Sequence, residues 1–304
     1  MPIRLPSNPH SPVVSYILLI LPPLFWAGNV VLARGLADQI PPLTMSFLRW
    51  STALLFLAPF TWRQVHRDWI LLRGHWKILS LCSLFGIASF NSLLYTATQT
   101  TTALNCSLMQ SLMPAAIILC SFLLDRERIG LQQGAGVLLC SFGAVWIVMQ
   151  GKLMSISSVK LVSGDLWMLL AIFCYALYST LLPRRPKIHP LSFLTITIML
   201  GTLMLIPPFL IELQIKGPPT ASISVLTGIL YVAIFPSIAA YLCWNRGIEM
   251  VGANRAGLFI NLIPVFAAGM AILFLGEKLQ NYHFAGILMV LAGMLMFQLS
   301  GKRG

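Results

Sequence analysis

The sequence NCSLMQSLMPAAIILCSFLL (105–124) places Pro114 in the middle of an apolar segment that is long enough to cross a membrane. A second segment, RAGLFINLIPVFAAGMAILF (255–274), places Pro264 at the same point 150 residues later. At this offset, ten positions of the stretch 103–145 carry the same residue in both copies, without a gap. A duplicated membrane unit whose helix is interrupted near the middle of the bilayer is typical of transporters more than of enzymes.

The composition predicts a chain that lies in a lipid bilayer. Of its 304 residues 58% are hydrophobic and 9% are charged, whereas a soluble domain carries roughly 25% charged residues. The net charge of +12 is interpreted as loop charge, because no basic run alternates with aromatic residues as in nucleic-acid sites. The six cysteines lie in apolar segments without Cys-x-x-Cys spacing, and the five histidines lie in loops or at segment ends. We therefore expect no nucleic-acid partner, disulfide framework, metal site or cofactor.

Ten apolar windows have the length that a transmembrane helix needs, about 20 residues. They cover residues 14–33, 42–61, 77–97, 104–124, 131–150, 164–183, 191–211, 222–244, 254–275 and 282–300. With the N-terminus in the cytoplasm, fourteen Lys and Arg residues fall on the inner side and five on the outer side, while Arg49 lies inside the second span. This distribution predicts that both termini are cytoplasmic, with a basic loop after residue 61.

Five spans per copy is an odd number, so the second copy enters the membrane from the opposite side. The predicted fold is an all-α integral membrane protein with ten transmembrane helices, arranged as two inverted five-helix repeats. Such repeats place their binding site between the halves, near the midplane of the bilayer. The predicted organisation is an N-terminal tail (1–13), a first repeat (14–150), a periplasmic linker (151–163), a second repeat (164–300) and a C-terminal tail (301–304).

Polar and aromatic side chains occur in pairs at helical spacing inside four of the spans. These pairs are Trp26 and Asn29, Asn91 and Tyr95, Tyr175 and Tyr178, and Tyr241 and Asn245. Polar groups at membrane depth are unfavourable unless they serve binding or pair with one another, so these residues are candidate substrate ligands. The pairs either line the two ends of a central path or form hydrogen bonds between helices, and the spacing leaves both roles open.

The two prolines have a mechanical consequence for their helices. A proline inside a helix lacks an N–H group, so the carbonyl groups of Gln110 and Ile260 are expected to lose their usual partners. We expect these carbonyls to face a cavity, where the side chains of Gln110 and Asn261 also contact a solute. The alternative is that Pro114 and Pro264 only bend their helices for packing.

Arg49 is the one charged residue that lies away from the ends of the predicted spans. It lies about seven residues into the second span, and we expect it to reach the outer headgroups or to pair with Asp38, with a role facing the solute as the less favoured alternative. All eight acids fall at span ends or in loops, so no carboxylate at membrane depth is available as a proton carrier. This absence favours facilitated movement or coupling through the solute's own charge, and it disfavours a cation antiporter.

Several short motifs identify a family. They are Leu24-Phe25-Trp26-Ala27-Gly28-Asn29, Phe47-Leu48-Arg49-Trp50, Ala103-Leu104-Asn105 leading to Met113-Pro114, Ala253-Asn254-Arg255-Ala256 leading to Ile263-Pro264, and Leu275-Gly276-Glu277. On these motifs the chain resembles the EamA-type proteins of the drug/metabolite transporter superfamily over residues 14–300. One departure is Leu124-Asp125-Arg126-Glu127, where such proteins commonly have Gly-Glu, and it leaves the turn after the fourth span open.

The resemblance implies a permease of the bacterial inner membrane that carries small metabolites and often exports amino acids. It also implies a cavity bounded by spans 1, 3, 4, 6, 8 and 9. The expected function is export of small organic metabolites by alternating access, with a small-molecule solute and the bilayer as partners and a homodimer left open. The alternatives are an efflux pump for drugs or cations and a non-transporting scaffold. A lipid-modifying enzyme is disfavoured because Cys106 and Ser107 have no histidine in the spans.

Overall fold

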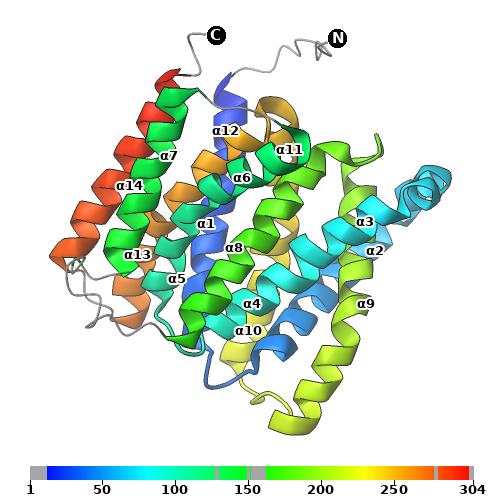
Figure 1. Ribbon diagram of the computed structural model, residues 1–304. Helices are drawn as coiled ribbons and strands as arrows, with labels where there is room; N and C mark the ends of the chain where they lie inside the picture. Colours follow the sequence, from blue (N-terminus) through cyan, green and yellow to red (C-terminus); the bar gives the residue numbers. More distant parts are fainter. Residues whose placement is uncertain (1–11, 127–129, 149–150, 152–161, 277–279, 301–304) are drawn as a thin grey trace.

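The structure is a computed structural model that describes residues 12–126, 130–148, 151, 162–276 and 280–300. Helices are the regular elements of this described part (Figure 1). In chain order they are α1 (Pro12–Gly35), α2 (Pro42–Gly74), α3 (Trp76–Cys82), α4 (Phe90–Ala97), α5 (Ala103–Met109), α6 (Met113–Asp125), α7 (Leu131–Val148), α8 (Ser163–Leu181), α9 (Pro190–Lys216), α10 (Ile223–Val232), α11 (Ala240–Val251), α12 (Ala253–Gly257), α13 (Ile263–Leu275) and α14 (Asn281–Ser300).

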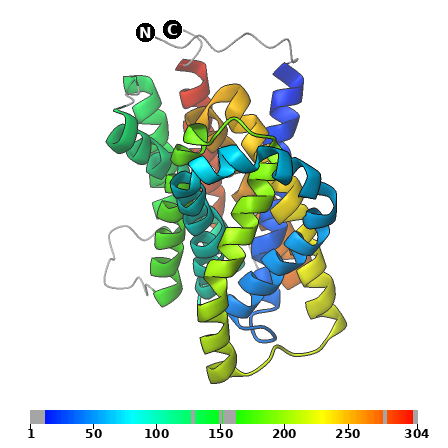
Figure 2. The same cartoon turned by 90° about the vertical axis from the view of Figure 1, so that its right-hand side faces the viewer.

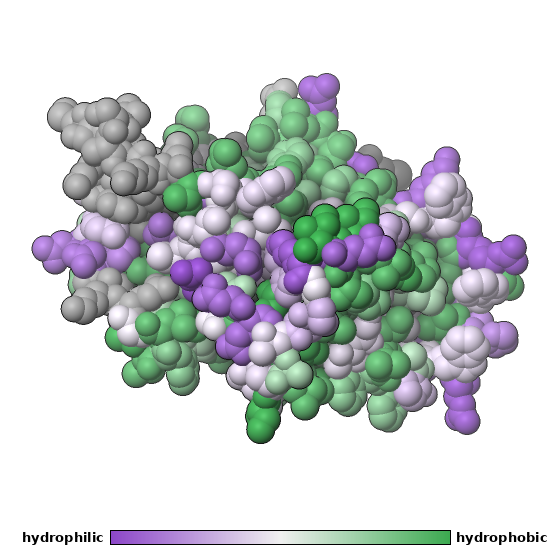
Figure 3. Space-filling model, turned by 90° about the horizontal axis from the view of Figure 1, so that it is seen from below, coloured by the Kyte–Doolittle hydropathy of each residue, from purple (hydrophilic) through white to green (hydrophobic). Residues whose placement is uncertain are grey.

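Eight helical stretches of the described residues are long and apolar enough to cross a membrane, and α14 contributes a shorter apolar stretch, Asn281–Phe297. The chain is therefore an all-helical, multi-pass membrane protein. Large apolar side chains such as those of Phe60, Ile223 and Leu273 are exposed on its surface, as expected for residues that face lipid. Seen from below, hydrophilic residues run across the middle of the face and also lie at its left and right edges, with hydrophobic residues above and below them (Figure 3).

The helix α2 is longer than the sequence predicts. Its 33 residues continue past residue 61 to Gly74, so the expected basic loop is the last part of a helix. No glycine or proline interrupts the chain between Pro59 and Gly74, and a helix of this length spans about 50 Å, more than the roughly 30 Å of hydrocarbon. The exposed Trp62 and Trp69 lie on this extension.

The helices of the first half pack against those of the second half in a reciprocal pattern (Figures 1 and 2). The helix α1 packs against α11 and α13, while α8 packs against α4 and α6. The helix α2 packs against α9, and α7 lies beside α14. The start of α1 and the end of α14 lie at one end of the bundle, which we call the upper end after Figure 1.

Glycines allow α7 and α14 to approach closely. A Cβ atom added to Gly136 would lie 2.6 Å from the carbonyl oxygen of Gly293, and one added to Gly143 would lie 2.8 Å from that of Gly286. The backbones are thus in direct contact at two points, two helical turns apart. The glycines that the sequence repeats at an offset of 150 therefore join the two halves within one chain.

Four helix irregularities interrupt the central helices at equivalent places in the two halves. The π-helical segments η1 (Ser83–Ser89) and η5 (Ala233–Ala239) connect α3 to α4 and α10 to α11, with an offset of 150 residues. The 3-10 segments η2 (Gln110–Leu112) and η6 (Leu258–Leu262) precede the helices that begin with the two prolines. No pattern in the sequence predicts η1 and η5.

The carbonyl groups of Gln110 and Ile260 lack the partner four residues ahead, as expected, but each has a partner three residues ahead. The N–H of Met113 bonds to the carbonyl of Gln110, and the N–H of Ile263 bonds to the carbonyl of Ile260. The backbone tightens into a 3-10 turn, so each carbonyl accepts from the residue three positions ahead and not four. The 3-10 turn thus replaces the bond that proline cannot make, and no cavity is needed to satisfy these carbonyls.

Candidate functional site

Arg49 of α2 lies at the centre of a buried polar cluster, with none of its surface exposed. The guanidinium bonds to Asn91 Oδ1 (2.6 Å), Tyr95 Oη (2.8 Å), Asn29 Oδ1 (3.3 Å), Ser237 Oγ and the carbonyl oxygen of Pro236 (3.1 Å). One side chain therefore joins α2 to α1, α4 and η5, and so connects the two halves of the chain.

The expectation that Arg49 reaches the headgroups or pairs with Asp38 is wrong. Its side chain points into the bundle because α1, α4 and η5 offer oxygen atoms within reach. All of its hydrogen-bond partners in the described part of the chain are neutral. The buried acids Asp165 and Glu212 bond elsewhere, to Thr101 and to Thr44. The positive charge of Arg49 therefore lies beside dipoles and not beside a carboxylate.

Two hydrogen bonds between helices occupy equivalent positions in the two halves. Tyr95 of α4 donates to Asn29 Oδ1 of α1 over 2.7 Å, and Tyr178 of α8 donates to Asn245 Oδ1 of α11 over 2.8 Å. Asn245 follows Tyr95 by 150 residues, so the donor and the acceptor have exchanged helices between the halves. In this conformation these four side chains connect helices, which is one of the two roles that their spacing leaves open.

The π-helical segments present backbone carbonyls to the other half. Pro236 and Gly86 are 150 residues apart, at the middle of η5 and of η1. The carbonyl of Pro236 accepts from Trp26 Nε1 over 3.1 Å, in addition to Arg49, and the carbonyl of Gly86 accepts from Tyr241 Oη over 2.6 Å. A π-helix shifts the backbone bonding pattern to i→i+5, and such bulges are frequent at functional sites.

Six aromatic side chains fill the centre of the molecule next to Arg49. This aromatic cluster consists of Trp26, Trp50, Tyr175, Tyr178, Tyr241 and Trp244, and its rings lie mostly edge to face or tilted. The centroid of Trp26 is 5.3 Å from that of Trp244 and 5.6 Å from that of Tyr175. The Arg49 guanidinium lies 4.7 Å from the ring centroid of Trp50, which is close enough for a cation–π contact. The rings close the centre in this conformation.

The helical spacing in the sequence does not single out Trp50, Trp244 or Ser237. It does predict the other four members of the aromatic cluster as candidate ligands. A usable signal exists for the tryptophans, because tryptophan in membrane proteins favours the headgroup level and these two lie within spans. Ser237 follows Pro236 inside η5, and only the tertiary contact with Arg49 distinguishes it from other small residues.

The residues near the two prolines form a separate group. Gln110 bonds to the carbonyl of Cys106 over 3.4 Å, and Asn261 approaches Cys140 Sγ of α7 at 3.7 Å. Both side chains are buried, as are Pro114 and Pro264. Within the described residues, no hydrogen bond or ring contact joins Gln110 or Asn261 to Arg49 or to the aromatic cluster.

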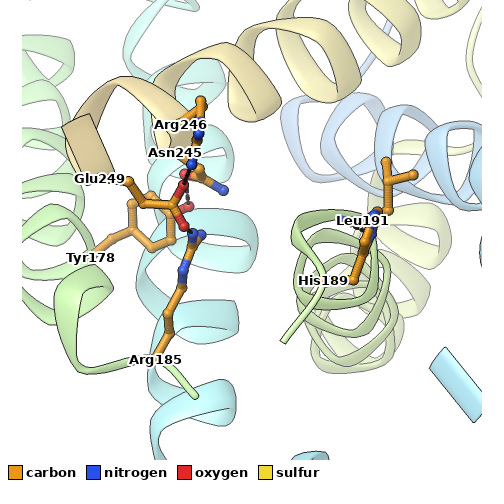
Figure 4. A network of polar contacts seen from close by, with 7 residues as sticks. All are labelled: Tyr178, Arg185, His189, Leu191, Asn245, Arg246 and Glu249. Carbon is orange, nitrogen blue, oxygen red and sulfur yellow. Dashed lines mark hydrogen bonds and ion pairs between the residues drawn. The ribbon is translucent and has the colours of Figure 1, made fainter. Parts of the chain in front are cut away.

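The upper end of the centre is closed by a polar network between α8 and α11 (Figure 4). Arg185, which follows η4 (Leu182–Arg184), pairs with Glu249 of α11, and Arg246 donates to the same carboxylate over 2.9 Å. Glu249 lies one helical turn beyond Asn245, the partner of Tyr178. The side chain of Arg185 is only 8% exposed, so this ion pair is partly screened from water. The network forms a second layer above the Tyr178–Asn245 bond.

The lower end of the bundle has a similar contact without an acid, although its arginine corresponds to Arg184, which pairs with Asp125, and not to Arg185. Arg34, at the end of α1, donates to the carbonyl of Thr98 over 3.1 Å at the end of α4. Arg34 precedes Arg184 by 150 residues. A groove of about 720 Å³ lies between α1, α10 and α13, and it reaches from Gln39 to Gly28, the neighbour of Asn29. Neither Arg49 nor any of its hydrogen-bond partners lines this groove.

One further motif lies partly outside the described residues. Glu127 and Glu277, which complete the Leu-Asp-Arg-Glu and Leu-Gly-Glu motifs, belong to the segments that the structure does not describe. The residues before them are described, and both helices end in the left-handed conformation. Arg126 has a φ of 56° and Gly276 a φ of 65°. The two helices therefore end in the same backbone conformation, although the residue at this position is arginine in the first copy and glycine in the second.

Comparison with known proteins assigns the family. The sequence profile of the EamA-like transporter family matches residues 13–149 and again residues 162–299. An uncharacterized transporter of Bacillus subtilis (strain 168), YyaM, is 27% identical over 92% of this chain and 92% of its own length. An uncharacterized transporter of Archaeoglobus fulgidus is also 27% identical, over 93% of this chain and 96% of its own length.

A solved crystal structure has the same fold, with a TM-score of 0.71 at 16% sequence identity, and it covers 96% of this chain and 99% of its own. The resemblance stated from the sequence motifs is thus confirmed by the two profile matches, which cover nearly the whole chain. The chain belongs to the EamA-like transporter family.

Proposed function

We propose that the protein is a secondary transporter of the bacterial inner membrane that exports small organic metabolites, with amino acids as the first candidates. The observation that carries this proposal is the buried Arg49 cluster with its aromatic neighbours, placed between the two halves of a membrane protein. Polar groups at membrane depth mark solute pathways in transporters. Membership in the EamA-like transporter family supports transport in general, while the solute class and the direction are part of the proposal.

The proposed architecture has ten transmembrane helices in two inverted repeats, with residues 14–150 and 164–300 as the two units. The reciprocal packing supports it, because α1 lies among helices of the second half and α8 among helices of the first. The identical offset of η1 and η5 supports it as well. The upper end of Figure 1 would then face the cytoplasm and carry both termini, in agreement with its basic residues.

The contacts at the two ends of the centre support the proposal of alternating access. The upper end is held by the Tyr178–Asn245 and Arg185–Glu249 contacts, and the lower end by the Tyr95–Asn29 and Arg34–Thr98 contacts. Breaking one set while keeping the other would open the centre to one side at a time. In an inverted repeat the two halves carry equivalent contacts at opposite ends of the centre. The same rearrangement can therefore open one end while it closes the other.

Two alternatives predict different results. An efflux pump for cations needs a negative or neutral centre, and the positive charge of Arg49 disfavours it. A scaffold without transport activity predicts no flux at all. The deciding experiment is uptake of labelled metabolites, including a panel of amino acids, into proteoliposomes that contain the purified protein. Saturable uptake that empty liposomes lack supports the proposal, and no uptake of any solute contradicts it.

Replacing Trp26 with alanine or Tyr241 with alanine is expected to weaken the tolerance of overproducing cells to toxic amino-acid analogues. Each change removes a ring of the aromatic cluster and a hydrogen bond to a π-helical carbonyl. The growth of cells on an analogue panel measures the effect, normalised to the amount of folded protein in the membrane. Trp62→Ala, at a site that is 71% exposed, is the matched control and should leave tolerance unchanged. Equal tolerance in all strains would contradict amino-acid export.

Replacing Glu249 with glutamine is expected to increase the rate at which maleimide labels Cys82. Cys82 of α3 is fully buried and lies within electrostatic range of Arg185, so a looser upper end should expose it. Loss of about 1 kcal/mol of the ion pair corresponds to roughly a fivefold higher open population. Mass spectrometry of the peptide that contains Cys82 follows the reaction. Asp125→Asn removes the more exposed ion pair with Arg184 and should have a smaller effect, because exposed pairs contribute little.

A further inference from the structure

We propose that Arg49 binds the carboxylate of the transported solute, and that the solute's apolar body lies against the aromatic cluster. The inference rests on the proposed transport function and names its substrate class, organic carboxylates with an apolar or aromatic body. Four features of the centre carry it: an uncompensated positive charge, neighbours that mostly have other hydrogen bonds, buried hydrogen-bond donors without partners, and the absence of an acid bonded to Arg49 among the described residues.

The charge of Arg49 is unfavourable where it lies. An arginine at the centre of a transmembrane helix costs about 2.5–3.5 kcal/mol or more, and such residues usually pair with an opposite charge. Here the partners in the described part of the chain are two amides, two hydroxyls and one backbone carbonyl. A carboxylate is the partner that the guanidinium fork fits best, because two parallel charge-assisted hydrogen bonds form at once.

Four of the five neighbours of Arg49 have hydrogen bonds besides the one with Arg49, and Asn91 Oδ1 is the exception. Tyr95 donates to Asn29, and Ser237 donates to the carbonyl of Val232 over 2.6 Å. The carbonyl of Pro236 also accepts from Trp26. The guanidinium can therefore turn from these oxygens to a solute without leaving most of them unpaired. A carboxylate of the solute would then replace neutral acceptors as the partner of Arg49.

Unused donors surround the same place. Trp50 Nε1, Trp244 Nε1 and Tyr175 Oη are buried and have no hydrogen-bond partner among the described residues. An indole N–H can only donate, and unpaired buried donors are unfavourable by about 1–3 kcal/mol each. All three belong to the aromatic cluster, and the Trp50 ring lies under the Arg49 guanidinium. A solute whose carboxylate oxygens lie within the aromatic cluster would pair with the charge of Arg49 and accept hydrogen bonds from these donors.

The same features exclude a cation as the preferred solute. No acid of the described residues bonds to Arg49 or to a member of the aromatic cluster, so an ammonium group meets only aromatic faces and carbonyls. The centre therefore selects for the carboxylate and tolerates an amine, and a solute that has an amine without a carboxylate is repelled by Arg49.

The test measures thermal stabilisation of the purified full-length protein by three compounds of one shape: 3-phenylpropionate, 3-phenylpropanamide and 3-phenylpropylamine. A ligand that binds the native state raises the melting temperature by mass action. We expect stabilisation by the carboxylate and little by the amide or the amine. Arg49→Gln should weaken carboxylate binding by about 100-fold, which corresponds to the loss of one or two charge-assisted bonds. Arg63→Gln, at an exposed site on the extension of the same helix α2, is the matched control and should bind like the parent protein.

A second variant keeps the test decisive if Arg49→Gln does not fold. Arg49→Lys keeps the charge but lacks the planar fork, and we expect it to fold and to bind the carboxylate about tenfold more weakly. Equal stabilisation by amide and carboxylate, no stabilisation by the carboxylate, or unchanged affinity in Arg49→Lys would each overturn the inference. Uptake of other metabolites in proteoliposomes would then still uphold the proposed transport function, and absence of all uptake would reject that function separately.

Discussion

Replacing Gly136 with alanine is expected to lower the free energy of unfolding by about 2–3 kcal/mol, within the range of overpacked cores. The added Cβ would lie 2.6 Å from the carbonyl oxygen of Gly293 and 2.9 Å from the backbone nitrogen of Phe297. Both obstacles are backbone atoms, so no side-chain rotation relieves the contact and α7 must move away from α14. Unfolding of the purified protein in mixed micelles with increasing SDS measures the change.

Gly269 provides the matched control for this prediction. It lies within α13, and no atom lies within 4 Å of the position that its Cβ would occupy. Glycine to alanine in a helix interior is favourable by about 0.5–1 kcal/mol when nothing opposes it. Gly269→Ala should therefore be neutral or stabilising. If Gly136→Ala behaved in the same way, the direct backbone contact between α7 and α14 would be refuted.

Replacing Gly86 with alanine is expected to reduce transport at least tenfold and to destabilise the protein by about 1–3 kcal/mol. Gly86 lies in η1, where its Cβ would be 2.7 Å from Cγ of Tyr178. The ring cannot rotate away, because Tyr175 and Tyr241 pack against it at centroid distances of 5.5 and 5.9 Å. The Tyr178–Asn245 bond at the upper end should therefore break, and the carbonyl of Gly86 should lose its alignment with Tyr241.

The variant Tyr178→Phe separates the two causes of this effect. It keeps the ring in place and removes only the hydroxyl that donates to Asn245. Such bonds within membranes contribute about 0.6 kcal/mol on average, so we expect a mild loss of stability. Gly86→Ala should lose more transport activity than Tyr178→Phe in proteoliposomes. It should also lose more stability in SDS unfolding. The reverse order would show that the hydroxyl, and not the packing of the ring, controls the upper end.

Periodicity and composition were sufficient to predict where the helices lie. The uninterrupted apolar windows predict the membrane-crossing stretches because each must satisfy its backbone hydrogen bonds within itself. The extension of α2 was missed, since the window ends where hydropathy falls, whereas the helix ends at the first residue that breaks it, Gly74. The π-helical segments were also missed, because no residue type encodes a π-bulge as proline encodes a kink.

The candidate site was only partly accessible from the sequence. Helical spacing brought out Trp26, Asn29, Tyr95 and other polar residues at membrane depth, since such residues are rare there. Their partners were not accessible, because spacing within one helix does not say which helix lies opposite. The structure shows that Asn29 pairs with Tyr95, which belongs to a different span. It also shows that Gln110 bonds to its own helix and belongs to a separate group.

The sequence by itself determined that this chain is a duplicated helical membrane protein of a transporter family, since length, hydropathy and local motifs are properties of contiguous residues. Only the tertiary structure decided where the side chain of Arg49 points. Its position in the sequence is compatible both with the headgroups and with the centre of the bundle. The physical reason is that a charge in the membrane takes the most favourable set of oxygens within reach of its side chain. Those oxygens come from α1, α4 and η5, which the chain brings together only by folding.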